Sequence, residues 1–382
     1  MMDYKKEISN YLDEVPKRKE FNIDRIKKEI KSSKHVCVFG IGAISYPIIS
    51  SIKNFTDIKI DFLSDNDQTK WGKIYHHDLK CISPAELEKY KDDIAILITT
   101  QHYKKIYQQL LKKGFQKIFA VTEYRLLNDN YFKNKQNLQK TKENVLKVMD
   151  ILEDERSKEI MVTLIKNWFD FNVDTIGYEN IFTNDQYYPT DIIKLSDNES
   201  FVDVGAYNGD TLFDFLNRTN NKFDSIFAFE LDNKNFKEME LAVDKLDINL
   251  KRKIKLYNSG LLDEEKDVYY ETGGSGMQST FINVINTASD CGKTVRLTDI
   301  LKNKKVTFIK MDIEGSEPKA LSGAEEIIQK QKPKLAICVY HKPEHLWEVP
   351  LYLKNIVPEY KIYIRHHTPL EYETVCYAVI EP

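Results

Sequence analysis

Three ionisable residues follow an apolar run in the segment 306–316, which reads VTFIKMDIEGS. Lys310, Asp312 and Glu314 stand at alternate positions, so on an extended backbone their side chains share one face. Burying such groups costs free energy unless a partner or a ligand satisfies them. The carboxyl end of a central strand is also where open α/β sheets bind ligands. The segment therefore predicts a reactive site; the alternative is a capping acid beside a solvated lysine.

His341 follows the next predicted strand, residues 334–340, and is expected to point into the same crevice. A lone histidine is more often structural, but a histidine beside two acids is a good candidate for a general base. We predict His341 as the base, with Asp312 second and Glu314 in the same catalytic set. Asp312 and Glu314 could instead hold a divalent cation that acidifies a hydroxyl. With no further clear ligand, no metal site is predicted.

A glycine turn in the segment 201–211, FVDVGAYNGDT, predicts a cofactor cradle between a buried strand and a helix. The spacing is Asp203-x-Gly205-x-x-x-Gly209, and a dinucleotide fingerprint would read Gly-x-Gly-x-x-Gly. An acid before the first glycine suits a ligand with a positive charge, which favours S-adenosylmethionine over a pyrophosphate. The alternative is an ordinary strand–turn–helix whose glycines serve packing only.

A second strand, SIFAFE at 225–230, ends in Glu230, which is placed to take the two hydroxyls of an adenosine ribose. A third strand, 254–256, leads to the polar tip 257–260, which is expected to touch the adenine ring. The glycine-rich loop 273–279 is expected to be a mobile lid or, alternatively, a hairpin tip.

The first 125 residues predict a separate α/β unit with a parallel sheet. Its turn, 40–45, carries Gly-x-Gly-x-x-Ser, and Asp65 stands about where a ribose acid would lie. The stretch 34–122 resembles the small N-terminal Rossmann-like domains of bacterial sugar-modifying enzymes, such as sugar acetyltransferases and dehydratases. That resemblance implies a nucleotide-sugar site; a structural or dimerisation domain is equally open. A Tyr-x-x-x-Lys pair at Tyr131 and Lys135 is attributed to chance.

Length and composition limit the remaining choices. The chain has 382 residues and a net charge of −3, so two or three domains are expected and nucleic acid is not a favoured partner. No apolar run approaches the ~20 residues of a membrane span, and the charged N-terminus does not suggest a signal peptide. The five cysteines are scattered, which favours free thiols and a cytoplasmic location. Residues 126–180 are expected to be helices that link 1–125 to 181–382, or that form a homodimer interface.

From about residue 150 to 382, the chain resembles the FkbM family of S-adenosylmethionine-dependent methyltransferases. The resemblance rests on FVDVGAYNGDT, AFELD, VRLTDIL, VTFIKMDIEGSEPKAL, and the closing YHKPEHLWEVPLYL, YIRHHT and ETVCYAV. It implies two doubly wound sheets in the whole chain, the second a class I methyltransferase fold whose seventh strand is antiparallel. Tyr207 departs from the family, where many members have Asn. The expected cofactor contacts are Asp203, Gly205, Ala206, Tyr207, Asn208, Gly209, Asp210, Thr211, Glu230, Leu231, Ser259 and Asp312.

The resemblance implies O-methylation of a small-molecule acceptor. A sugar or nucleotide-sugar in bacterial surface polysaccharide biosynthesis is expected as acceptor, by family analogy. Two alternatives remain: a non-enzymatic NAD or nucleotide-sugar sensor, and an NAD-dependent epimerase or dehydratase built on the first unit. The retained acids Asp203, Glu230 and Asp312 favour the methyltransferase.

Overall fold

The computed structural model describes residues 3–17, 22–42, 45–55, 58–76, 78–100, 102–120, 135–169, 177–272, 280–283, 290–370 and 372–381. The chain divides into two compact units. The first comprises Met1–Glu143, Val162–Asn180 and Gly274–Met277, and the second comprises Asn144–Met161, Ile181–Gly273 and Gln278–Pro382. The division passes through the helices α8 (Lys135–Ile151) and α9 (Glu155–Phe169). The expected three-part split, with a helical linker at 126–180, stays a prediction.

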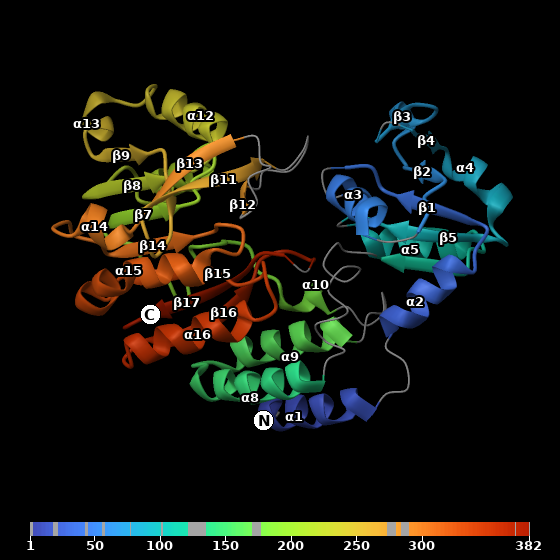
Figure 1. Cartoon of the computed structure of the whole chain (residues 1–382), viewed down its shortest axis with the longest axis horizontal. Helices are drawn as coiled ribbons and strands as arrows, with labels where there is room; N and C mark the ends of the chain where they lie inside the picture. The colour runs from blue at the N-terminus through green and yellow to red at the C-terminus, as the bar shows by residue number, and fades with distance from the viewer. Residues whose placement is uncertain are drawn as a thin grey trace. The chain divides into compact units, whose positions relative to one another are not determined.

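The first unit is built on a six-stranded sheet of order β3-β4-β2-β1-β5-β6 (Figure 1). Its strands are β1 (His35–Phe39), β2 (Phe62–Ser64), β3 (Ile74–Tyr75), β4 (Leu79–Ile82), β5 (Ile94–Ile98) and β6 (Lys117–Ala120). Every pair of neighbouring strands in this sheet is parallel except the pair β3–β4, which is antiparallel. Its helices are α1 (Tyr4–Glu14), α2 (Asn22–Lys31), α3 (Ser45–Phe55), α4 (Pro84–Leu87) and α5 (Tyr103–Lys112). The alternating pattern of the sequence foresaw this sheet but not α1.

The second unit contains a seven-stranded sheet of order β16-β17-β15-β14-β7-β8-β9. Its strands are β7 (Ser200–Val204), β8 (Ser225–Phe229), β9 (Ile254–Tyr257), β14 (Phe308–Met311), β15 (Lys334–Cys338), β16 (Lys361–His366) and β17 (Thr374–Val379). β17 runs antiparallel to both of its neighbours, as expected, and the other pairs are parallel. The strand order reverses between β7 and β14, so this point of the sheet is a topological switch.

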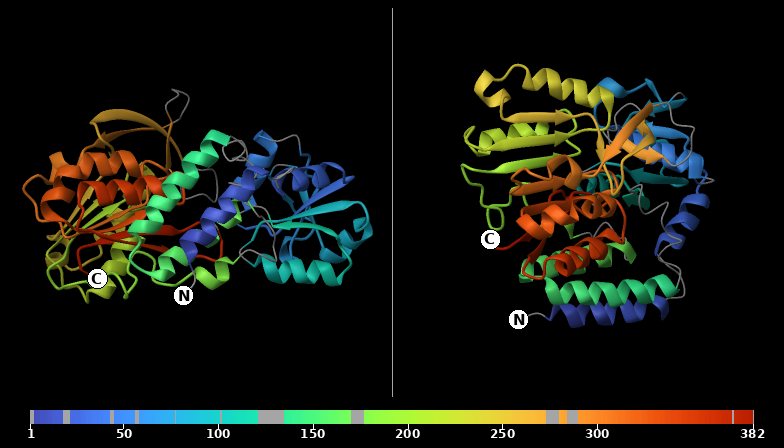
Figure 2. Two further views of the ribbon diagram at one scale, coloured as in Figure 1. Left: turned by 90° about the horizontal axis from the view of Figure 1, so that it is seen from below. Right: turned by 60° about the vertical axis from the view of Figure 1, so that its left-hand side comes forward.

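Helices connect the parallel strands of this sheet. They are α11 (Asp210–Arg218), α12 (Asn233–Val243), α13 (Ile248–Lys251), α14 (Leu297–Leu301), α15 (Glu317–Gln331) and α16 (His345–Ile356); the short helix α10 (Tyr178–Ile181) spans the division between the two units, most of it in the first. Figures 1 and 2 show α15 and α16 side by side along one face of the sheet. The connections β7–α11–β8 and β14–α15–β15 run in opposite directions across it, so right-handed crossovers place α11 and α15 on opposite faces.

The centre of the sheet is held by aromatic packing. The rings of Phe201 and Phe215 stack at 4.6 Å, and those of Phe201 and Phe308 stack at 5.1 Å. All three side chains are fully buried. Every residue of β7 is buried, because a central parallel strand is covered on both faces. The core therefore fixes β7 and β14, the two strands whose ends carry the candidate site.

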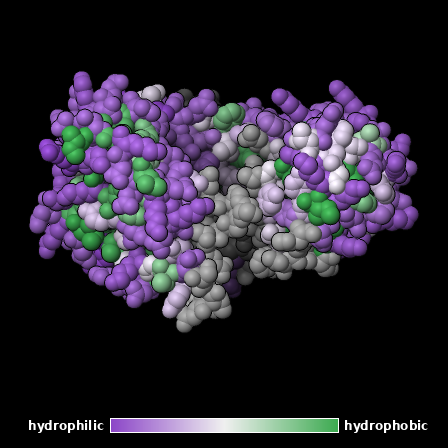
Figure 3. All heavy atoms as spheres, turned by 90° about the horizontal axis from the view of Figure 1, so that it is seen from above, coloured by the Kyte–Doolittle hydropathy of each residue, from purple (hydrophilic) through white to green (hydrophobic). Residues whose placement is uncertain are grey.

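A second, smaller sheet in this unit was not predicted. It consists of β10 (Gly260–Leu261), β11 (Lys266–Thr272), β12 (Thr280–Asn283) and β13 (Asp290–Val295), in the order β10-β13-β11-β12. The proposed lid, 273–279, falls outside the described residues, as does Tyr131. Figure 3 shows a largely hydrophilic surface with separate small apolar patches. Within the described residues, no helix combines the length and the hydropathy that a membrane crossing requires.

Candidate functional site

A cleft of about 310 Å³ opens in the second unit, at the carboxyl ends of the central strands. It is lined by Gln186, Tyr187, Val204, Gly205, Tyr207, Asp210, Thr211, Phe229, Glu230, Leu231, Ser259, Gly260, Leu261, Lys310, Asp312, Ile313, Glu314, Ser316, Tyr340 and Glu373. Eight of the twelve expected cofactor residues are in this set. Asp203, Ala206, Asn208 and Gly209 are not. The position agrees with the rule that open α/β sheets bind ligands at the switch point.

The glycine turn forms one wall of the cleft. Gly205 and Gly209 have φ values of +76° and +93°, which favour glycine. A Cβ on Gly205 would lie only 2.0 Å from the carbonyl oxygen of Asp312, so the turn and the end of β14 approach each other closely. Tyr207, the departure from the family pattern, has φ +48°, and its backbone N–H donates to Glu230 Oε2 at 2.8 Å. Glycine at 205 is thus required by both backbone conformation and space.

Asp203 lies behind the cleft wall, fully buried. Lys310 Nζ is 3.1 Å from Asp203 Oδ1 and donates a hydrogen bond of 2.7 Å to the carbonyl oxygen of Gly205. Burial raises the pKa of Asp203 to about 6, although the charge of Lys310 opposes the shift. The negative charge of Asp203 is therefore balanced by the ammonium group of Lys310. Direct contact between Asp203 and a ligand cation stays a prediction.

Glu230 directly follows β8 and is 6% exposed. Its two oxygens accept backbone N–H bonds from Tyr207 (2.8 Å) and Asp232 (2.7 Å). Burial raises the pKa of Glu230 to about 7, while the two backbone bonds oppose the shift. Each oxygen keeps a further lone pair, so the carboxylate can still accept bonds from two hydroxyls.

Leu231 and Ser259 line the cleft beside Glu230, and their contact with an adenine ring stays a prediction. Asn258 braces the two loops, because its Nδ2 donates to the carbonyl oxygens of Glu230 (2.9 Å) and Leu231 (3.2 Å). The rings of Phe229 and Tyr257 stack at 4.6 Å next to these residues. These contacts give the cleft a rigid edge made from the ends of β8 and β9.

Asp312 lines the cleft together with two tyrosines that were not predicted as site residues. Tyr187 Oη donates to Asp312 Oδ2 at 2.8 Å, and Tyr340 Oη donates to Asp312 Oδ1 at 3.1 Å. Glu373 also lines the cleft and accepts a hydrogen bond from Gln186. Burial and the charge of Asp312 raise the pKa of Glu373 to about 7. Lys310, Asp312 and Glu314 all line the cleft as predicted, although β14 ends at Met311 and a turn carries Glu314 there.

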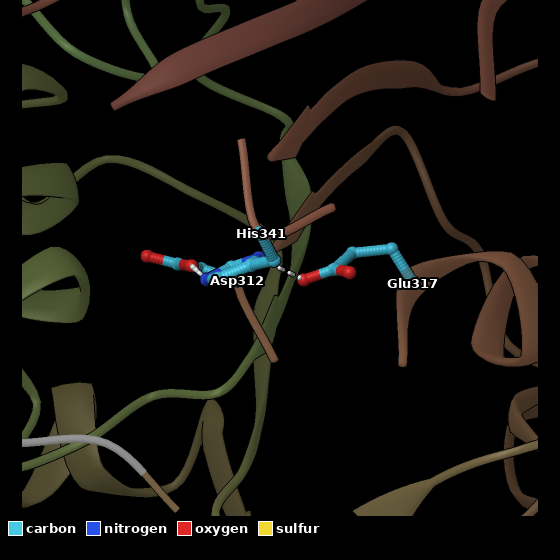
Figure 4. A group of neighbouring side chains, drawn as sticks. All are labelled: Asp312, Glu317 and His341. Atoms are coloured by element: carbon cyan, nitrogen blue, oxygen red, sulfur yellow. Dashed lines mark ion pairs between the residues drawn. The ribbon is translucent and has the colours of Figure 1, made fainter. Parts of the chain in front are cut away.

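His341 sits between carboxylates, as Figure 4 shows for Asp312 and Glu317. Its Nδ1 lies 2.9 Å from Glu317 Oε1, and its Nε2 lies 3.4 Å from Asp312 Oδ1 and 3.3 Å from Glu314 Oε2. Burial alone would lower the pKa of His341, but these carboxylates, Glu317 foremost, outweigh it and raise the pKa to about 10. His341 does not line the cleft, and it is an imidazolium at neutral pH. In this state it cannot accept a proton as the predicted base.

Glu317, the first residue of α15, was also missed. Its side chain is fully buried, and its second oxygen lies 3.4 Å from Nδ1 of His345. Burial alone would raise the pKa of Glu317, but His341 and His345 outweigh it and hold the pKa well below the usual range. The local sequence Glu-Pro at a helix start reads as an ordinary helix terminus. Only the fold brings Glu317 to His341.

The turn of the first unit is held internally. Asp65 Oδ2 accepts bonds from the Ile41 N–H (2.7 Å) and from Lys70 Nζ (2.9 Å), and Lys70 also donates to the carbonyl oxygen of Ile41 (2.6 Å). Asp65 thus already braces the turn that the sequence analysis considered for a ribose. Nothing in these contacts favours NAD, so a cofactor at this turn stays a prediction.

Comparison with known proteins identifies two regions. Residues 203–360, less than half of the chain, match the family model described as the methyltransferase FkbM domain. Residues 32–119 match the model described as C2185-like, N-terminal, so the resemblance of this region to sugar-modifying enzymes is not confirmed. No curated protein matches the chain. The expected enzyme class, an S-adenosylmethionine-dependent methyltransferase, is confirmed by the domain match.

Among solved structures, the chain is similar to the methyltransferase FkbM from Methylobacillus flagellatus KT, with 22% identity, 98% of each chain covered and a TM-score of 0.77. At this identity the similarity shows the fold, and it does so for both units. Two other structures match about half of the chain. The fibrillarin/Nop5p complex has 16% identity, 49% and 75% coverage of this and that chain, and a TM-score of 0.32. A SAM-dependent methyltransferase from Aquifex aeolicus has 18% identity, 48% and 85% coverage, and a TM-score of 0.29.

Proposed function

We propose that the second unit binds S-adenosylmethionine in the cleft and methylates a hydroxyl of a sugar or glycan precursor. The observation that carries the proposal is the set of residues that one cleft brings together. A glycine turn, the ribose-type acid Glu230 and the acids Asp312 and Glu314 all line it. Binding and proton removal are thereby brought together at the switch point of the sheet.

The cofactor fits the residues present. Gly205 leaves the space that a Cβ would fill, so backbone groups of the turn stay accessible to a ligand. Glu230 keeps lone pairs for two ribose hydroxyls, and Leu231 and Ser259 supply the adenine side of the cleft. Hydroxyl donors would also stabilise the ionised form of Glu230, whose pKa burial raises to about 7.

S-adenosylmethionine supplies an already activated methyl group, so the protein mainly has to position the acceptor and remove its proton. Asp312 and Glu314 line the cleft and are better placed than His341 to accept that proton. Tyr187 and Tyr340 hold the Asp312 carboxylate from two sides, which fixes its direction. Asp312 is therefore the proposed base, and His341 holds the carboxylates together.

A sugar acceptor agrees with the chemistry of these acids, because carboxylates accept hydrogen bonds from hydroxyls. Asp312, Glu314 and Glu373 present several acceptor oxygens on the same side of the cleft. The acceptor's identity rests on the family analogy; these contacts support a polyhydroxylated molecule. Cytoplasmic location and a homodimer likewise stay predictions.

Calorimetric titration tests the proposal. The full chain is titrated with S-adenosylmethionine, with its demethylated product S-adenosylhomocysteine, and with NAD and UDP-sugars in parallel. We expect binding of the first pair only, weakened on the order of 10- to 100-fold in Glu230→Ala, because a charged hydrogen-bond acceptor is lost. Glu238→Ala, an exposed acid on the adjacent helix α12, is the matched control and should bind normally. Binding of NAD or a UDP-sugar alone would move the functional centre to the first unit.

A further inference from the structure

Three side chains with possible metal-ligand atoms lie close together beside the cleft. Asp312, Glu317 and His341 each offer one ligand atom, and these atoms all lie within 4.8 Å of one another. They come from the loop after β14, the start of α15 and the loop after β15. Figure 4 shows the imidazole placed between the two carboxylates. Three separate elements thus converge on one point beside the cleft.

The hydrogen bonding of these three side chains is incomplete. The side chains of His341 and Glu317 are 8% and 0% exposed. His341 Nδ1 lies 2.9 Å from Glu317 Oε1, but within the described part of the chain Nε2 of His341 and Oε2 of Glu317 have only longer ion-pair contacts of 3.3–3.4 Å. His341 Nε2 lies 3.4 Å from Asp312 Oδ1, longer than the ~2.7–2.9 Å of a charge-assisted hydrogen bond. Buried polar atoms left in this state call for a partner that the chain itself does not supply.

We propose that Asp312, Glu317 and His341 bind a divalent transition-metal ion, which displaces the proton that His341 carries in the metal-free chain. One imidazole with two carboxylates suits Mn²⁺, Fe²⁺, Co²⁺ or Zn²⁺, whereas Mg²⁺ and Ca²⁺ prefer oxygen ligands alone. Asp312 lines the cleft, whereas Glu317 and His341 lie behind it. The sequence analysis rejected a metal because it saw only two acids; the fold supplies the other ligands.

The role of the ion rests on the proposed function. A cation beside Asp312 would lower the pKa of an acceptor hydroxyl, as bound divalent ions do for water. With Asp312 bound to the ion, Glu314 would replace it as the base: the hydroxyl proton would pass to Glu314, the oxygen would form the new bond to the methyl carbon, and the sulfur would keep the electron pair of the broken carbon–sulfur bond. Glu314 lines the cleft, and its Oε2 is 3.3 Å from His341 Nε2, so it lies next to the proposed ion.

Direct metal binding is the test. The full chain is freed of metal with a chelator and titrated with Mn²⁺ by electron paramagnetic resonance, and with Co²⁺ and Zn²⁺ by calorimetry. We expect one saturable site. Asp312→Asn and His341→Gln should each weaken it on the order of 10- to 100-fold or more, the range for lost supporting residues of metal sites. Glu348→Gln and His102→Gln, at exposed positions elsewhere, are the controls and should leave binding unchanged.

The same samples are titrated with S-adenosylhomocysteine. Binding of S-adenosylhomocysteine without any metal site overturns the metal proposal and leaves the proposed function standing. Metal binding that is unchanged in both Asp312→Asn and His341→Gln also overturns the metal proposal, because the ion then lies elsewhere. Metal binding without S-adenosylhomocysteine binding supports the site and refutes the proposed function instead. Circular dichroism checks that each variant folds. If His341→Gln does not fold, the metal proposal is tested by Asp312→Asn alone, because the Asp312 side chain is partly exposed.

Discussion

Replacing Gly205 by alanine should destabilise the second unit and abolish cofactor binding. Gly205 has φ +76°, and an added Cβ would lie 2.0 Å from the carbonyl oxygen of Asp312. A left-handed L-residue costs about 1–2 kcal/mol. Overpacking adds roughly 1–3 kcal/mol, because the Asp312 N–H donates to the Val204 carbonyl oxygen at 3.0 Å and the strand end cannot retreat freely. The free energy of unfolding should fall by about 2–5 kcal/mol in total.

Gly114→Ala is the matched control. Gly114 has φ +88°, but an added Cβ there would meet nothing within 4 Å. It should cost only the conformational part, about 1–2 kcal/mol. Denaturant unfolding followed by hydrogen exchange and mass spectrometry gives the loss for each unit separately, and calorimetry gives the affinity for S-adenosylhomocysteine.

Two results would refute this reasoning. If Gly205→Ala loses no more stability than Gly114→Ala, the turn does not approach Asp312 as closely as the structure shows. If Gly205→Ala is destabilised but keeps its affinity for S-adenosylhomocysteine, the turn is a packing feature and not part of the binding site.

Three further predictions concern packing and charge. Gly323→Ala in α15 should lower the melting temperature, because the added Cβ would lie 2.0 Å from the Leu262 carbonyl oxygen. This loss is expected even though alanine favours helices. A melting temperature at or above that of the wild type contradicts the prediction. Lys310→Met should lower the free energy of unfolding by about 3–5 kcal/mol, because it leaves the buried Asp203 carboxylate unpaired. Adding Asp203→Asn should restore part of this loss in denaturant titrations. A double variant no more stable than Lys310→Met argues against the pairing. Burial lowers the pKa of His366 to about 3, so the unfolded chain binds a proton between pH 6.5 and 3 that the folded chain does not. The free energy of unfolding of the wild type should therefore fall with acidification by about 1.4 kcal/mol per pH unit relative to that of His366→Gln. If the stability–pH curves of the two proteins run parallel, His366 is not buried as a neutral group.

The sequence predicted those features that depend on local patterns. The strand–turn–helix at 201–211 was recognisable because buried parallel strands are short apolar runs and the turn needs glycine at fixed positions. Glu230 and Asp312 were found because each directly follows such a strand, and parallel strands end at one edge of the sheet.

The remaining site residues depend on contacts between distant parts of the chain. Tyr187 and Glu373 reach the cleft from segments before β7 and before β17, and no local spacing relates them to Asp312. The role of His341 as a base was predicted without its charge, because that charge depends on carboxylates from several loops. The small β10–β13 sheet was missed because its strands are short or half-exposed, without a clear apolar period.

Charge in the cleft limits which ligands it can take. The described residues that line it include one base, Lys310, and five acids: Asp210, Glu230, Asp312, Glu314 and Glu373. Lys310 is already paired with Asp203, and the charge of His341 is shared among Asp312, Glu314 and Glu317, so the acids outnumber the cations, and burial raises the pKa of both Glu230 and Glu373 to about 7. S-adenosylmethionine carries a sulfonium charge that its demethylated product lacks, whereas the diphosphate of a nucleotide-sugar adds negative charge. We therefore expect the methyl donor to bind more tightly than S-adenosylhomocysteine at pH 7, and a UDP-sugar to bind only when a divalent cation is present. Calorimetry with and without chelator measures both, and tight binding of a UDP-sugar in chelator would show that these acids do not face the acceptor.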